Sequence, residues 1–144
     1  MVVDLYTDGA CKGNPGPGGW GVVIIIDGEK TNEIYGGEPN TTNNRMELSA
    51  VINGLKNVDE AFNVRVNTDS MYVKNGICSW IKKWEVNGWK TASKKEVANK
   101  DLWSELLALE KNRRVVWNWV RGHSGNVGNE RADFLANKGI AECC

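Results

Sequence analysis

The chain opens with Val2-Val3-Asp4-Leu5-Tyr6-Thr7-Asp8-Gly9, an apolar segment that ends in an aspartate and a glycine. A second segment, Val64-Arg65-Val66-Asn67-Thr68-Asp69, ends in nearly the same way. Each pattern predicts a β-strand with an aspartate at its carboxyl end. The ligand crevice of an open α/β sheet lies outside these ends, so neighbouring strands would bring Asp8 and Asp69 together. The alternatives are a turn residue for Asp8 and a helix N-cap for Asp69.

Hydrophobic periodicity predicts the elements around these two strands. Residues 19–27 and 29–36 are expected to form two more strands, joined by an Asp27-Gly28 turn. The remaining elements are expected to be helices around 43–57, 70–84 (one or two short ones), 102–109 and 132–140, and a last strand at 115–120. This order predicts a mixed sheet with helices packed on it, the α/β class. Because no linker or repeat interrupts the chain, we predict a single domain, residues 1–144.

The composition argues against several classes of protein. The longest apolar run, Val22 to Ile26, is too short to cross a bilayer, and the N-terminus lacks the features of a secretory signal. We therefore expect a cytoplasmic protein with no membrane partner. The 4 cysteines form no C-x-x-C pair, which argues against a zinc site.

Charge is unevenly distributed along the chain. The 18 basic and 18 acidic residues give a formal net charge of zero, which alone argues against a nucleic-acid binder. Residues 82–100, however, contain six lysines and two glutamates, so this stretch carries +4 and the remainder −4. Acidic and basic functions are therefore expected to occupy different parts of the molecule.

Three further residues are candidates for chemistry. Glu47 shares a predicted helix face with small apolar residues and has no basic partner at helical spacing, which suggests close packing where a carboxylate is needed. Asp133 lies just off the apolar stripe of the last helix. The alternative for both is a solvated surface carboxylate. His123, the single histidine, lies in a glycine-rich loop and could shuttle protons near neutral pH or be an ordinary loop residue.

A cluster of these carboxylates would need cations. Four carboxylates in a low-dielectric crevice repel one another strongly, unless divalent ions neutralise them. Oxygen ligands favour Mg²⁺ or Mn²⁺. Two such ions, about 3.5–4 Å apart, can activate a water and stabilise the leaving oxygen in phosphodiester cleavage.

Five motifs then occur in the order and spacing of one family. They are Thr7-Asp8-Gly9-Ala10-Cys11-Lys12-Gly13-Asn14-Pro15-Gly16-Pro17-Gly18-Gly19, Thr42-Asn43-Asn44-Arg45-Met46-Glu47-Leu48, Thr68-Asp69-Ser70, Gly122-His123-Ser124-Gly125 and Asn129-Glu130-Arg131-Ala132-Asp133. Together they resemble ribonuclease H of type I over essentially the whole chain. The resemblance implies a five-stranded mixed sheet flanked by helices. It also implies hydrolysis of the RNA strand of an RNA–DNA hybrid, leaving a 3′-hydroxyl and a 5′-phosphate.

The resemblance assigns roles to individual residues. It implies that the metal ligands are Asp8, Glu47, Asp69 and Asp133, and that His123 assists proton transfer or product release. Two Mg²⁺ ions are expected, with Mn²⁺ as a substitute, and the protein is expected to be a monomer.

Substrate contacts are also carried over from the family. Asn14, Asn43 and Asn44 match positions that contact the minor groove of the hybrid, where amides suit 2′-hydroxyls and base edges. Thr42 and Asn99 match a pocket for a DNA-strand phosphate, although Asn99 could be only a helix N-cap.

The stretch Trp80-Ile81-Lys82-Lys83-Trp84-Glu85-Val86-Asn87-Gly88-Trp89-Lys90, called the protrusion below, matches the family's basic protrusion. Lys82 and Lys83 are expected to contact phosphates, while Trp80 and Trp84 are expected both to pack along the DNA backbone and to hold the protrusion onto the domain. Glu85-Val86 departs from a pair that is often basic in the family, which predicts weaker affinity. Because the chain starts at the first strand, we expect no separate hybrid-binding module.

Two other functions compete with this interpretation. Another nuclease or strand-transfer enzyme of the same fold would use a similar acidic cluster, but the asparagines suited to 2′-hydroxyls favour a ribonuclease H. A non-catalytic hybrid-binding module would be marked by a missing carboxylate, and all four are present.

Overall fold

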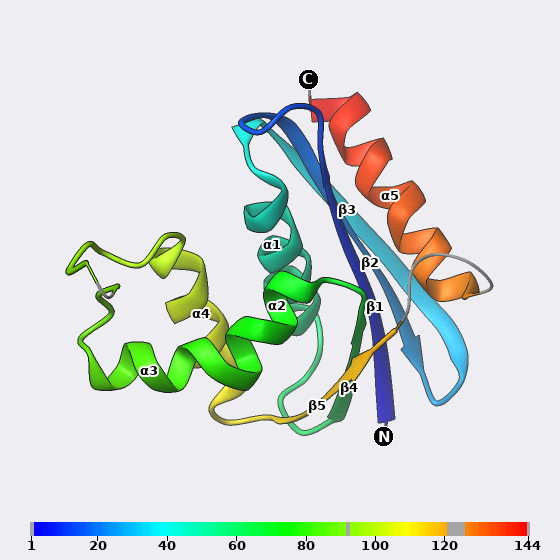
Figure 1. Ribbon diagram of the computed structural model, residues 1–144. Helices are drawn as coiled ribbons and strands as arrows, with labels where there is room; N and C mark the ends of the chain where they lie inside the picture. Colours follow the sequence, from blue (N-terminus) through cyan, green and yellow to red (C-terminus); the bar gives the residue numbers. More distant parts are fainter. Residues whose placement is uncertain (1, 92, 121–125, 144) are drawn as a thin grey trace.

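A five-stranded mixed sheet forms the centre of the protein (Figure 1). The computed structural model describes residues 2–91, 93–120 and 126–143, without the side chains of residues 30 and 31. The strand order is β3-β2-β1-β4-β5, with β1, β2 and β3 antiparallel and β1, β4 and β5 parallel. The strands are β1 (Val2–Cys11), β2 (Gly16–Ile26), β3 (Glu29–Thr41), β4 (Asn63–Thr68) and β5 (Arg114–Trp119). The expected α/β class and mixed sheet are confirmed.

The two strands that end in aspartates are parallel neighbours. The register of β1 with β4 pairs Tyr6 with Asn67, so Asp8 and Asp69 both lie two residues beyond the same rung of the ladder. This register is the condition under which the two carboxylates meet at one edge of the sheet.

The predicted ends of two strands are wrong. β1 continues to Cys11, beyond the expected end at Asp8, and β3 continues to Thr41, beyond the expected end at Gly36. Each extension begins with a glycine, and that of β3 also contains Pro39 and Asn40, all residue types of low β-propensity. Both extensions are held by pairing with β2, as in the rung between Gly16 and Thr41. Long-range pairing therefore overrides the local turn signal.

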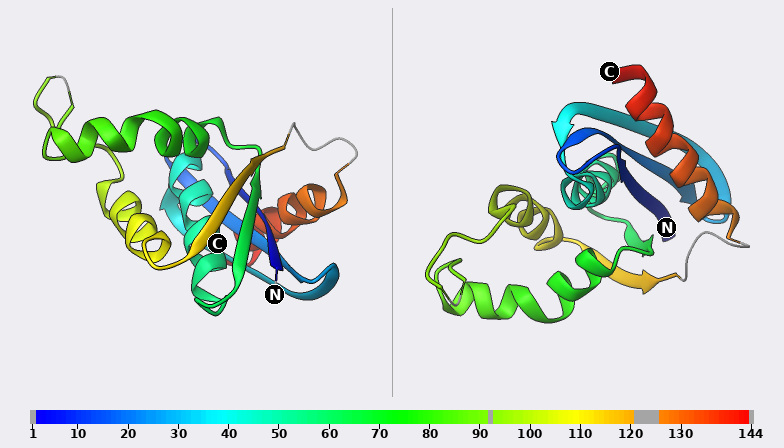
Figure 2. Two further views of the ribbon diagram at one scale, coloured as in Figure 1. Left: turned by 90° about the horizontal axis from the view of Figure 1, so that it is seen from below. Right: turned by 45° about the horizontal axis from the view of Figure 1, so that its top comes forward.

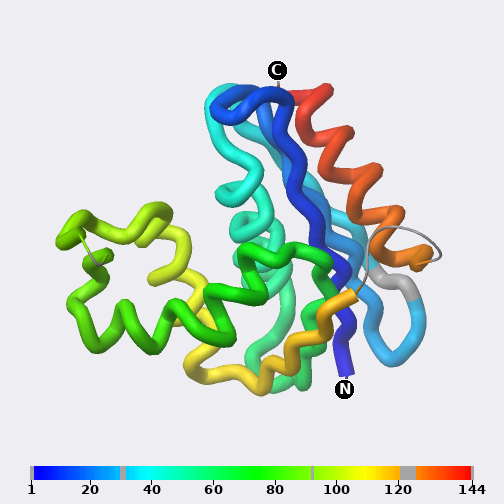
Figure 3. Tube along the Cα trace, viewed as in Figure 1, coloured from blue at the N-terminus to red at the C-terminus, as the bar shows by residue number. Residues whose placement is uncertain are grey.

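Helices cover both faces of the sheet. Two of them, α1 and α5, lie on opposite faces, and α5 packs over β1, β2 and β3 (Figure 2). A continuous helical path of α2, η1 and α3 leads away from the sheet, where one or two short helices were expected (Figure 3). The helices are α1 (Asn43–Lys56), α2 (Met71–Asn75), the π-helical turn η1 (Gly76–Trp80), α3 (Ile81–Val86), α4 (Lys100–Glu110) and α5 (Val127–Cys143).

The main core lies between the sheet, α1 and α4. Its side chains include Leu5 and Val66 from the strands, Leu48 from α1, and Trp103 and Leu106 from α4, all fully buried. Burying each such side chain stabilises the fold by about 1.5–3 kcal/mol. The core therefore fixes α1 and α4 relative to β1 and β4.

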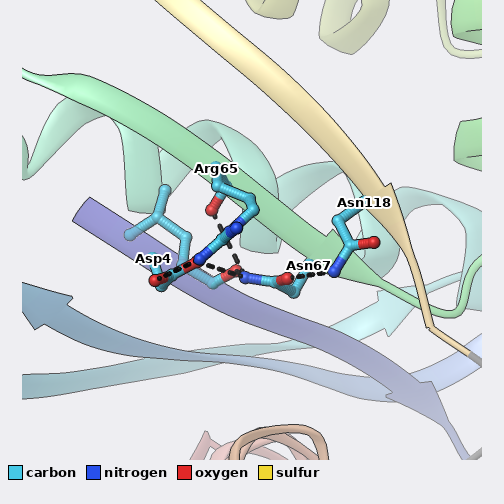
Figure 4. A network of polar contacts seen from close by, with 5 residues as sticks. Asp4, Arg65, Asn67 and Asn118 are labelled. Carbon is cyan, nitrogen blue, oxygen red and sulfur yellow. Dashed lines mark hydrogen bonds and ion pairs between the residues drawn. The ribbon is translucent and has the colours of Figure 1, made fainter. Parts of the chain in front are cut away.

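Part of the sheet is tied together by a polar network on β1, β4 and β5 (Figure 4). Arg65 donates to both carboxylate oxygens of Asp4, at 2.6 and 3.1 Å. The buried Asn67 donates to Asp4 at 3.1 Å and accepts from Asn118 at 2.7 Å. The network links residues on three strands, so a shift of register would leave buried polar groups unpaired.

Candidate active site

Asp8 and Asp69 occupy positions that the simpler interpretations do not describe. Asp8 lies within β1, opposite Gly21 of β2, and is 3% exposed, so it is not a turn residue. The N-cap of α2 is Ser70, whose Oγ accepts a hydrogen bond from the N–H of Val73, so Asp69 is not the cap. Both aspartates therefore lie toward the carboxyl ends of the parallel strands β1 and β4, where a ligand can bind.

Glu47 is brought to the same place by close packing of α1 on β1. A Cβ at Gly9 would overlap the backbone of Met46 and Glu47, so only glycine permits this approach. The Glu47 side chain is 6% exposed, which contradicts the alternative of a solvated surface glutamate. The packing of α1 on β1 therefore removes most of the Glu47 carboxylate from solvent.

Three carboxylates converge from three elements. One oxygen from each of Asp8, Glu47 and Asp69 can be chosen so that all lie within 4.8 Å of one another. Asp133 of α5 is half-buried and shares a side-chain hydrogen bond with Asp8, so the fourth predicted residue reaches the same cluster. This approach is possible because α5 packs against β2, where a Cβ at Gly21 would overlap the backbone around Ala132.

The cluster holds protons strongly. Burial raises the pKa of Asp8 to about 9, with the charge of Glu47 and the hydrogen bond to Asp133 as further causes. Burial likewise raises the pKa of Glu47 to about 8, with the charge of Asp69 adding to it and hydrogen bonds from the Gly9 N–H and the Asp8 carboxyl opposing it. Desolvation and mutual repulsion both disfavour the ionised forms, and a divalent cation would relieve both.

The donor set fits a divalent metal ion. Every donor is a carboxylate oxygen, the type that Mg²⁺ and Mn²⁺ prefer. Glu47 Oε2 is buried without a hydrogen-bond partner among the described residues, an arrangement that is costly unless a cation completes it. The Asp8, Glu47 and Asp69 cluster is thus consistent with a divalent metal site.

The predicted minor-groove residues gather at the start of α1. Asn14 Oδ1 accepts a hydrogen bond from the backbone N–H of Asn43 at 3.0 Å, which joins the loop after β1 to this helix. Asn44 is exposed on the first turn. Thr42 is the N-cap of α1, and its Oγ1 accepts from the N–H of Arg45 at 3.2 Å.

Asn99 stands at the N-cap position of α4 but does not cap it. Its side chain makes no capping hydrogen bond. Instead Oδ1 accepts from Arg45 at 3.2 Å and Nδ2 donates to the Tyr72 hydroxyl at 3.1 Å. Through Arg45, Asn99 is connected to the start of α1, where Thr42 lies. The alternative of a plain N-cap does not describe this side chain.

The protrusion includes α3, which lies at the end of the helical path of α2, η1 and α3 that leads away from the sheet (Figure 1). Lys82 and Lys83 are exposed on α3. Trp84 contacts Trp80 at a ring-centroid distance of 5.9 Å and the buried Trp103 at 5.6 Å. The tryptophans therefore hold the protrusion onto the domain, as expected, while remaining half-exposed.

One predicted residue falls outside the described part of the chain, and two residues join the site without having been predicted. His123 lies outside the described residues. Arg45 and Tyr72 were given no role by the sequence, although Arg45 stands inside a quoted motif. Their connection to Asn99 spans 54 and 27 residues of chain, a distance over which local patterns carry no signal.

The sequence matches known proteins over nearly its whole length. Residues 1–141 match the family model described as RNase H. The chain belongs to the RNase H family. It is 58% identical over 140 residues to a ribonuclease H of Francisella tularensis subsp. novicida (strain U112), covering 97% of this chain and 91% of that protein. It is 57% identical over 141 residues to a ribonuclease H of Ehrlichia ruminantium (strain Gardel), covering 97% of this chain and 95% of that protein.

Solved structures of RNase H proteins share the fold. LC9-RNase H1, described as a type 1 RNase H with the type 2 active-site motif, superposes with a TM-score of 0.87 and 35% identity, covering 99% of this chain and 74% of that one. LC11-RNase H1 in complex with RNA/DNA hybrid gives a TM-score of 0.72 and 28% identity, covering 97% of each chain. Among the described residues, no helix has both the length and the apolar character needed to cross a membrane.

Proposed function

We propose that this protein hydrolyses the RNA strand of RNA–DNA hybrids in a two-metal-ion reaction that leaves 3′-hydroxyl and 5′-phosphate ends. The observation that carries the proposal is the convergence of Asp8, Glu47 and Asp69 from β1, α1 and the end of β4. Membership of the RNase H family and the structural likeness to a relative solved with an RNA/DNA hybrid support the choice of substrate.

Four carboxylates of this chain would hold the ions. Asp8, Glu47, Asp69 and Asp133 offer oxygen ligands to Mg²⁺, with Mn²⁺ as a substitute. Bound there, the ions would supply Lewis-acid activation of water and of the leaving oxygen. The protein would bury Asp8 and Glu47, hold Glu47 through the Gly9 N–H, and release the protons that the raised pKa values of Asp8 and Glu47 retain. His123 is proposed to assist proton transfer or product release.

Substrate recognition is proposed to divide among three surfaces. Asn14, Asn43 and Asn44 would contact the minor groove, where 2′-hydroxyls distinguish RNA from DNA. Thr42 and Asn99 would grip a phosphate of the DNA strand. The protrusion would contact the DNA backbone through Trp80, Lys82, Lys83 and Trp84.

A cleavage assay tests the proposal. Labelled RNA–DNA hybrid, duplex RNA and duplex DNA are each incubated with the protein, with Mg²⁺ or with chelator, beside Asp69→Asn as the inactive control. We expect cleavage of the RNA strand of the hybrid alone, and only with the ion. Comparable cleavage of duplex DNA would indicate another nuclease of this fold, and hybrid binding without cleavage would indicate a non-catalytic module.

The remaining proposals concern the state of the protein. We propose that residues 1–144 act as one catalytic domain, that the protein works as a monomer in the cytoplasm, and that its macromolecular partner is the hybrid duplex. Sedimentation of the protein with and without hybrid tests the monomer, since a dimer would double the mass of the free protein.

A further inference from the structure

Asn99 has a backbone conformation that its local role does not explain. Its φ of 62° and ψ of 24° lie in the left-handed region, which asparagine adopts more readily than most residues other than glycine. An asparagine at a helix N-cap usually adopts extended backbone and accepts a hydrogen bond from the first turn. Asn99 does neither, so its side chain is held for another purpose.

The oxygen and the nitrogen of the Asn99 side-chain amide can be told apart from the hydrogen bonds that their neighbours make. Arg45 can only donate, so the atom facing it at 3.2 Å is Oδ1. Nδ2 therefore faces the Tyr72 hydroxyl at 3.1 Å. That hydroxyl also accepts from Nε1 of the fully buried Trp103 at 2.9 Å, which anchors it to the core. One hydrogen of Nδ2 remains without a partner among the described residues.

Arg45 is itself immobilised. Its Nη1 and Nη2 donate to the two carboxylate oxygens of Asp101 at 3.0 and 2.9 Å, a bidentate pair that joins α1 to α4. The N–H of Arg45 also donates to Thr42 Oγ1. Thr42 and Asn99, far apart in the sequence, are thus connected through one arginine.

We propose that Arg45 is a positioning residue: held by Asp101, it orients the Asn99 amide so that the remaining Nδ2 hydrogen meets a DNA-strand phosphate. This rests on the proposed function, since it takes Asn99 as a phosphate contact. The Arg45 guanidinium is committed to Asp101, so its role is orientation rather than attraction of the phosphate. Tyr72 supplies the second fixed point of the amide.

Asp101→Asn separates orientation from charge. The substitution removes a negative charge from the binding face, so simple electrostatics predicts equal or tighter binding of the polyanionic hybrid. The proposal predicts the opposite: KM for hybrid rises about three- to tenfold, as for the loss of one hydrogen bond, and the change falls on KM rather than on kcat. Asp101 has a side chain that is 65% exposed, so the variant is expected to fold.

Asp4→Asn is the matched control. Asp4 forms the same type of bidentate pair, with Arg65, in the network of Figure 4, which includes neither Asn99 nor a residue of the protrusion. Its KM should remain within about twofold of the wild type. Equal or lower KM for Asp101→Asn, or the same rise for both variants, would overturn the inference.

A double variant identifies Asn99 as the target. If Arg45 and Asp101 act through Asn99, then Asp101→Asn should add nothing in an Asn99→Ala background. Full additivity would overturn the inference. The Asn99 side-chain NH₂ signals in NMR spectra of the free protein provide a readout that needs no substrate: they should shift in Asp101→Asn and stay in place in Asp4→Asn. Absence of hybrid cleavage by the wild type would instead refute the proposed function, leaving the NMR result to judge the orientation.

Discussion

The carboxylate cluster and the protrusion are built in opposite ways. Asp8, Glu47 and Asp69 come from three separate segments; Asp8 and Glu47 are buried and Asp69 is half-buried. Lys82 and Lys83 are neighbours on one short helix and point into water. Each carboxylate in the cluster affects the ionisation of the others, so replacing one changes the whole cluster. Each exposed lysine makes a small, independent contribution to the binding free energy. Substitutions should therefore have large effects in the cluster and small ones in the protrusion.

The largest effect is expected at the cluster for Asp69→Asn. The substitution keeps the shape of the side chain but removes a charged metal ligand. We therefore expect kcat to fall by more than about 10²-fold. Single-turnover cleavage of labelled hybrid measures it. A decrease no larger than that of the lysine variants would erase the contrast between the two regions.

A smaller decrease is expected for His123→Ala. If His123 assists proton transfer or product release without holding metal, the rate should fall by about 10²-fold, the low end for general acid–base help. The two variants are compared in the same assay at saturating Mg²⁺. Equal decreases for His123→Ala and Asp69→Asn would contradict this division of roles.

Stability sharpens the comparison through Asp8→Asn. The folded-state pKa of about 9 lies above the unfolded value of about 4, so the folded protein retains an extra proton at neutral pH. This difference in pKa contributes to the free energy of unfolding. The contribution is fully present below pH about 4 and is lost as the pH rises toward 9. In chelator, Asp8→Asn should flatten this decline and raise Tm at neutral pH.

Mg²⁺ provides the control for that experiment. It should stabilise the wild type by about 2.7 kcal/mol at a hundred times its dissociation constant, and Asp8→Asn by less, because the variant lacks one ligand. Thermal melts give the Tm of each protein in chelator and in Mg²⁺. A lower Tm for Asp8→Asn in chelator, with equal responses to the ion, would refute the clustered site.

The smallest effects are expected in the protrusion. Changing Lys82 and Lys83 to Ala should raise KM by no more than about tenfold. The salt slope, which is the decrease in the logarithm of the binding constant per unit of log salt concentration, should become smaller by about 1 for each lysine–phosphate interaction that the substitutions remove. Turnover at saturating hybrid should change little. An unchanged KM and salt slope would show that the protrusion does not touch the substrate.

Glu85→Lys tests the same region in the other direction. Glu85 is exposed beside Val86, which is 85% exposed, at the pair where the resemblance led us to expect basic residues. The added positive charge should lower KM about twofold and steepen the salt slope. A higher KM would mean that Glu85 makes a favourable interaction with the hybrid.

Short-range patterns are sufficient to predict much of the fold. Alternation in residues 64–68 and helical spacing in residues 43–57 predict β4 and α1 closely, because their apolar residues face one core. The ends of β1 and β3 beyond Asp8 and Gly36 contain glycine and, in β3, proline and asparagine, so they resemble turns or loops in the sequence. The pairing that holds them in the sheet comes from β2. The continuous helical path from α2 to α3 is likewise predicted only as one or two short helices.

The sequence by itself determined the α/β class, the family and the residue types needed at the site, because motifs and periodicity are local properties of the chain. Only the tertiary structure decided which carboxylates lose their water, since the close approach at Gly9 and the parallel register of β1 and β4 arise between distant segments. It also decided the orientation of Asn99 through Arg45, Asp101 and Tyr72. Desolvation and hydrogen-bond geometry depend on neighbours in space, and those neighbours exist only once the chain has folded.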